Sequence, residues 1–186
     1  MTPVTTGFGL PRYLRRFARN REGVSAVEFA LVLPVMLSLY IGGVEVGDGM
    51  AINFKATLAA RTVTDLASQY VSIDNATMSS ILGAASTVLT PYSTSNIVVT
   101  VSEITTNAHG AGTVTWSDSL NGTARVVGSS ITLPTKLQTA NITILFGEVT
   151  YPYTPAMGYV LTGTINIYES VYFYPRMSTT ITRVDS

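Results

Sequence analysis

One long apolar run constrains this chain more than any other feature. Residues 24–44, VSAVEFALVLPVMLSLYIGGV, contain a single charged side chain, Glu28. A helix rises about 1.5 Å per residue, so a run of this length covers roughly 30 Å, the thickness of the hydrocarbon core of a bilayer. The run therefore predicts one membrane-spanning helix. The alternative is a cleaved secretory signal, which has a shorter apolar region followed by a small-residue cleavage site.

Charge is distributed unevenly between the two ends of the chain. Five arginines and one glutamate precede Val24, a net charge of +4, and they include Arg15, Arg16 and Arg19. The remainder carries six basic and ten acidic residues, a net charge of −4. Basic flanks stay on the cytoplasmic side of bacterial membranes. We therefore expect a cytoplasmic N-terminus and a C-terminal part outside the cytoplasm.

Glu28 requires an explanation because a carboxylate inside an apolar membrane helix is costly unless it is paired or neutralised. It lies about one turn inside the apolar run, so its side chain could reach the cytoplasmic headgroups. Alternatively, cutting the chain after Gly23 would give Val24 a free amino group. Val24 and Glu28 are four residues apart on one helical face, where an amine and a carboxylate can meet. The pair could form within one chain or between neighbouring helices.

The residues around this position resemble a known family. The segment Gly23-Val24-Ser25-Ala26-Val27-Glu28-Phe29 is similar to the processing site of type IV pilin-like precursors. The longer string resembles the opening of the TadE/TadG-like pseudopilins of the tight-adherence (Tad/Flp) pilus system. The matching positions are Gly23, Ala26, Val27, Glu28, Phe29, Ala30, Leu31, Pro34, Gly43 and Glu45.

This resemblance implies a function and a set of partners. A prepilin peptidase would cut between Gly23 and Val24, and Glu28 and Phe29 would serve assembly. The partners would be the inner membrane and the other Tad pilins and assembly proteins. Surface attachment, adherence and biofilm formation are the processes that the resemblance implies.

Three further residues within or beside the run suit packing between membrane helices. Pro34 introduces a kink and frees a carbonyl that a neighbouring group must satisfy. Gly43 and Gly47 have the small-xxx-small spacing that lets helices approach closely in lipid. Each feature also occurs without an assembly role, as a tolerated kink or as a chance spacing.

The chain divides by composition into four segments. We expect a basic cytoplasmic leader over 1–23, a transmembrane helix over 24–48, an extracytoplasmic helical region over 49–90 and a β-rich head over 91–186. In the helical region, apolar residues recur at spacings of three and four, which predicts an amphipathic helix interrupted near Asp74. These residues are Ala51, Phe54, Leu58, Ala59, Val63, Leu66, Ala67 and Tyr70.

The head has the Thr-, Val-, Ile- and Tyr-rich composition of strands and turns. Alternating or β-rich runs predict strands over 97–105, 112–118, 141–151, 164–174 and 177–184, with the first two as a hairpin. Pro152 and Pro155 are expected to separate two of the strands. The predicted fold class is α+β: a long N-terminal transmembrane helix continues outside the membrane and packs on an antiparallel sheet.

The sequence offers little material for catalysis or metal binding. His109 is the only histidine and cysteine is absent, so we expect no enzyme activity, no metal site and no cofactor. The acidic excess of the outer part argues against nucleic-acid binding. Trp116 and the late tyrosines fit either a binding surface or the core.

Three functions remain open from the sequence. The leading one is a pseudopilin or minor pilin-like component of a Tad system, which is a single-pass protein of the bacterial inner membrane with a periplasmic head. A second is an uncleaved single-span scaffold of the same assembly machine. A third is a tethered periplasmic domain whose tyrosines line a ligand groove.

Overall fold

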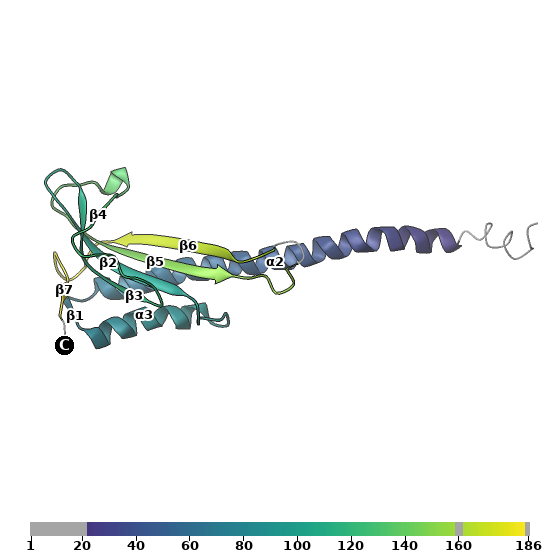
Figure 1. Ribbon diagram of the computed structural model, residues 1–186, viewed down its shortest axis with the longest axis horizontal. Coiled ribbons are helices and arrows are strands. Elements are labelled where there is room, and N and C mark those ends of the chain that lie inside the picture. The colour runs from purple at the N-terminus through teal and green to yellow at the C-terminus, as the bar shows by residue number, and fades with distance from the viewer. Residues whose placement is uncertain (1–21, 159–161, 185–186) are drawn as a thin grey trace, which may run out of the picture.

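A single long helix carries the rest of the fold at one end. The computed structural model describes residues 22–158 and 162–184. Helix α2 runs over Glu22–Ser68, which is 47 residues. Its first half projects alone, and its second half packs on a sheet and a second helix that together form the head (Figure 1). This arrangement confirms the predicted α+β class with a long N-terminal helix.

The second half of α2 buries a row of small side chains against the head. Ile52, Val63 and several alanines recur on one face at spacings of three and four, which is the periodicity of a helix face. The alanines of this row are Ala56, Ala59, Ala60 and Ala67. Because these side chains are short, the helix axis lies close to the sheet.

Five antiparallel strands form the main sheet. They are β2 (Val98–Thr106), β3 (Gly112–Leu120), β4 (Ser130–Ile131), β5 (Thr143–Tyr153) and β6 (Ile165–Phe173), in the order β4-β3-β2-β5-β6. Odd-numbered residues such as Val99, Val101 and Val149 join the core between the sheet and the helices. A short helix, η1 (Thr135–Leu137), lies between β4 and β5.

The predicted hairpin forms as β2 and β3. Val99 pairs with Leu120 at one end of the ladder and Thr106 pairs with Gly112 at the other. The side chain of Asn107 accepts hydrogen bonds from the backbone N–H groups of His109 and Ala111, at 2.9 and 3.0 Å. These bonds hold the turn and place His109 on its exposed side.

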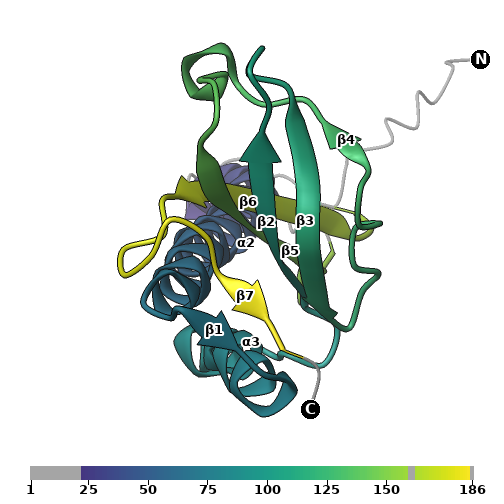
Figure 2. The ribbon, with the colours of Figure 1, turned by 90° about the vertical axis from the view of Figure 1, so that its left-hand side faces the viewer.

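Helix α3 (Asn75–Leu89) packs against α2 as a second helix under the sheet (Figure 2). Asp74 caps its first turn, because its carboxylate accepts a 2.7 Å hydrogen bond from the N–H of Thr77. This bond lowers the pKa of Asp74. At the other end, Lys55 Nζ of α2 donates to the carbonyls of Val88 and Thr90. The interruption predicted near Asp74 is thus the start of α3, and α2 ends earlier, at Ser68.

Two details of the predicted strands are wrong. Pro152 does not separate strands but lies inside β5, opposite Asn166. Proline is tolerated there because the first residue of β2, Val98, pairs with Thr150. No residue of β2 therefore lies opposite Pro152 to accept a hydrogen bond from it. The run 177–184 contributes only β7 (Thr182–Arg183), which pairs in parallel with β1 (Ser72–Ile73) in a separate small sheet (Figure 2).

A buried carboxylate fixes the C-terminal segment. Glu103 of β2 is 1% exposed, and its Oε1 accepts a 2.7 Å hydrogen bond from the N–H of Ile181. Trp116 Nε1 donates to the carbonyl of the same residue at 2.8 Å. Both backbone groups of Ile181 are therefore occupied by side chains of the main sheet. This explains why the segment does not add a sixth strand to that sheet.

Gly147 of β5 should not tolerate a side chain. A β-carbon there would overlap the Thr64 hydroxyl and approach the Ala60 carbonyl of α2. We expect Gly147→Val to destabilise the head by about 1–3 kcal/mol, measured by thermal unfolding of the full chain in detergent. Gly83→Ala, on an open face of α3, is the control and should raise stability by roughly 0.5–1 kcal/mol. Equal melting of both variants would contradict close packing at Gly147.

Glu103 should give the head a measurable pH dependence. Burial raises the pKa of Glu103 above its usual value of 4.5, and the Ile181 N–H opposes this shift only in part. Its contribution to stability is therefore complete below pH 4.5 and is lost as pH rises through the raised pKa. We expect Glu103→Gln to gain melting temperature relative to wild type as pH rises above 4.5. A difference in melting temperature between the two proteins that stays constant across this pH range would contradict the prediction.

Candidate processing and assembly site

The first half of α2 has no packing partner within the described chain. Every residue from 23 to 40 is exposed, including bulky apolar side chains such as Phe29, Leu31 and Tyr40. By length and composition α2 can cross a membrane. The head does not cover this apolar surface. Lipid or neighbouring helices would remove it from water.

The predicted processing residues lie at the N-terminal end of this helix, away from the head. Gly23 and Val24 occupy its first turn, and a β-carbon at Gly23 would meet no heavy atom within 4 Å. Glu28 lies one turn further on, on the same side as Val24, and is exposed. The head therefore leaves this end of the chain accessible to a peptidase or to another helix. Arg15, Arg16 and Arg19 lie outside the described residues.

Pro34 is accommodated within a continuous helix. The helix assignment runs without a break from Glu22 to Ser68, although Pro34 lacks the N–H that would bond the Ala30 carbonyl. Ser38 Oγ donates to the Pro34 carbonyl at 2.8 Å, which supplements the backbone bonds of the next turn. Any kink at Pro34 would thus act within the apolar half of α2.

The glycines near residue 45 divide between two faces of α2. Gly42 is buried, and Gly49 lies against the Tyr153 ring, where a β-carbon would be 3.4 Å from Cε1. Gly43 and Gly47 face away from the head, with no heavy atom within 4 Å of a β-carbon. The predicted packing pair is therefore on the free face of the helix.

Gly43 and Gly47 belong to a longer row of exposed residues, which we name the outward stripe. Its members are three to seven residues apart and share one helix face, opposite the alanine row. They are Phe29, Met36, Tyr40, Gly43, Gly47, Met50, Phe54 and Leu58, and all are exposed. The stripe continues from the apolar half of α2 into the part that packs on the head.

The outward stripe corrects one interpretation of the sequence. Of the residues in the predicted apolar period of the 49–90 region, the structure buries Ala59, Val63 and Ala67. It leaves Phe54 and Leu58 exposed. The spacing alone identifies two apolar faces and cannot say which one meets the sheet. The small size of the alanines was the available signal, because only short side chains permit this close approach.

The head is joined to α2 where the predicted membrane span ends. Tyr153 Oη donates to the Glu45 backbone carbonyl at 2.8 Å, and the side chain of Glu45 is buried. Burial raises the pKa of Tyr153, and the nearby Asp48 and Glu45 carboxylates raise it further. The phenol therefore remains a hydrogen-bond donor at neutral pH. This contact holds the end of β5 against the helix.

The aromatic residues divide between core and surface. Trp116, Tyr151 and Tyr153 are buried in the core, whereas Tyr168 and Tyr174 are about half exposed. Tyr159 lies outside the described residues. Within residues 22–158 and 162–184, no group of three or more histidine or acidic side chains is arranged to hold a metal ion.

Comparison with known proteins identifies the helix rather than the head. Residues 23–65 match the family model of TadE-like proteins, which confirms the resemblance found in the sequence. The match covers nearly all of α2 and includes the outward stripe. No curated protein and no solved structure matches the chain.

Proposed function

We propose that this chain is a pseudopilin or minor pilin-like component of a Tad pilus assembly system. It is made as a precursor, cut after Gly23, and held in the bacterial inner membrane with its head in the periplasm. The TadE-like match over residues 23–65 supports involvement in such a system. The outward stripe is the observation that supports an assembly role, because it is an unfilled helix-packing face on the matched segment.

The stripe favours packing against helices that run in the same direction. Chains inserted with the same topology have parallel helices. The same residue of two neighbouring chains therefore lies at the same depth in the membrane. Gly43 and Gly47 permit close backbone approach there, as small residues do in lipid. Outside the span, Met50, Phe54 and Leu58 extend the same contact with apolar side chains that would leave water.

Glu28 has a specific part in this assembly. After cleavage, the new Val24 amine and the Glu28 carboxylate of one chain or of neighbouring chains lie at one level of the membrane. Pairing would offset the cost of keeping the carboxylate in an apolar helix. Phe29, the next residue, lies on the stripe and would pack beside this pair.

Processing can be tested directly on the protein purified from its native membrane. We expect intact-mass measurement and N-terminal sequencing to find a chain that begins at Val24. Gly23→Val should retain the leader, because a branched side chain replaces the residue before the cut bond. A wild-type chain that retains residues 1–23 would instead indicate the uncleaved single-span scaffold.

Helix packing can be tested by disulfide cross-linking, since the natural chain has no cysteine. We expect Met50→Cys and Phe54→Cys to form cross-linked species in membranes under mild oxidation, visible on a non-reducing gel. Met177→Cys is the matched control, because Met177 is 67% exposed and Met50 is 70% exposed. Equal cross-linking at Met177 and Met50 would remove the stripe as the specific interface.

A further inference from the structure

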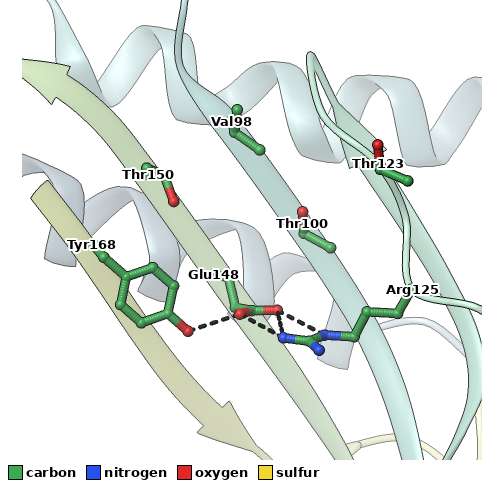
Figure 3. Close-up of a pocket in the computed structure, with 7 residues that line it drawn as sticks. All are labelled: Val98, Thr100, Thr123, Arg125, Glu148, Thr150 and Tyr168. Carbon is green, nitrogen blue, oxygen red and sulfur yellow. Dashed lines mark hydrogen bonds and ion pairs between the residues drawn. The ribbon is translucent and has the colours of Figure 1, made fainter. Parts of the chain in front are cut away.

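The sheet face that points away from the helices carries a polar hollow (Figure 3). Its volume is about 250 Å³. It is lined by Val98, Thr100, Thr123, Arg125, Glu148, Thr150 and Tyr168. These residues come from β2, β5, β6 and the loop after β3, so the fold brings together positions that are far apart in the sequence.

A planar ion pair forms the floor of this hollow. Arg125 Nε donates to Glu148 Oε2 at 3.0 Å, and Nη2 donates to both carboxylate oxygens at 2.7 Å. Tyr168 Oη donates to Glu148 Oε1 at 2.7 Å from the other side. The hydrogen bonds of Arg125 to Glu148 use Nε and Nη2, and Figure 3 draws no dashed line from Nη1 to another lining residue. The pair thus retains donor capacity.

The cluster is electrically balanced and held in place. One guanidinium neutralises one carboxylate, and burial together with the Glu148 contact raises the pKa of Tyr168 to about 12. The phenol therefore stays uncharged at neutral pH. Arg125 also lies over the Phe146 ring at 5.3 Å, and Phe146 stacks on Tyr172 with ring centroids 4.4 Å apart. These contacts orient the guanidinium before any ligand arrives.

The lining selects one class of ligand by chemistry. A free anion would face Glu148 and a free cation would face Arg125, so neither gains from a neutral pair. An apolar ligand would remove threonine hydroxyls and the ion pair from water without replacing their hydrogen bonds. A sugar ring offers hydroxyls that donate and accept along its edge, and a C–H face that can rest on the half-exposed Tyr168 ring.

We propose that this hollow binds a neutral saccharide unit of a glycan chain. The Thr123 and Thr150 side chains and Arg125 Nη1 meet the sugar hydroxyls, and Tyr168 contacts the ring face. Thr100 is buried and its hydroxyl is bonded to Ser119 Oγ at 2.8 Å, so it shapes the hollow rather than binding the sugar. The hollow is open to solvent, so one unit of a longer glycan chain can reach it. This binding is separate from the assembly role of α2, since no hollow residue belongs to that helix.

The test uses the full chain in lipid nanodiscs prepared without glycosidic detergents, which would themselves compete as sugars. Saturation-transfer-difference NMR is recorded with cellotetraose and with tetra-N-acetylchitotetraose. These probes distinguish a plain hexose polymer from an N-acetylated one. We expect signal transfer to the ring protons of at least one of them. Tyr168→Ala should weaken that binding roughly tenfold through loss of the ring contact.

Two further variants separate binding from folding. Tyr174→Ala is the matched control, because Tyr174 is 53% exposed and Tyr168 is 52% exposed, and only Tyr168 lines the hollow. Thr150→Val keeps the side-chain shape and removes one hydroxyl, so it should weaken binding with little effect on folding. Weaker binding in Tyr168→Ala and Thr150→Val, with unchanged binding in Tyr174→Ala, supports the proposal. Absent transfer with wild type, or equal binding in Thr150→Val, overturns it.

Discussion

The close contact between α2 and β5 is the constraint on which the rest of the structure depends. Gly147 removes the side chain at the contact, and Ala60 and Thr64 on α2 let the backbones approach. Because the face of α2 with the buried alanines packs on the sheet, the larger apolar residues of α2 remain on the opposite face. The exposed stripe is therefore a consequence of how the head packs.

Polar contacts join the C-terminal segment to the far end of the head, beside the buried side chains of Ile73 and Ile181. Glu103 and Trp116 hold both backbone groups of Ile181, and Arg183 bridges the Asp118 carboxylate and the Ile73 carbonyl. Such buried polar groups stabilise a structure only when they are well bonded, and they are costly when a partner is lost. The C-terminal segment is thus positioned by directed bonds, which fix one arrangement.

Several parts of this arrangement follow from the sequence and others do not. The charge-poor run around Glu28 and the alternation in β2 and β3 are local patterns, so the long helix and the hairpin could be predicted. The hollow could not, because Arg125 follows β3 and meets Glu148 of β5 only through the pairing of both strands with β2. The parallel β1–β7 pair likewise depends on residues more than a hundred positions apart.

Helix α2 passes from its apolar half into the head without a linker, and Tyr153 clamps the junction at Glu45. The sheet therefore has a fixed position and orientation relative to the axis of α2. If the helix packs against its neighbours one residue further along its axis, the sheet moves by about 1.5 Å along that axis. Keeping the same helix face towards the neighbours then also turns the sheet by about 100° around the axis. The axial position of the helix in an assembly therefore sets both the height of the outer sheet face and the direction in which it points.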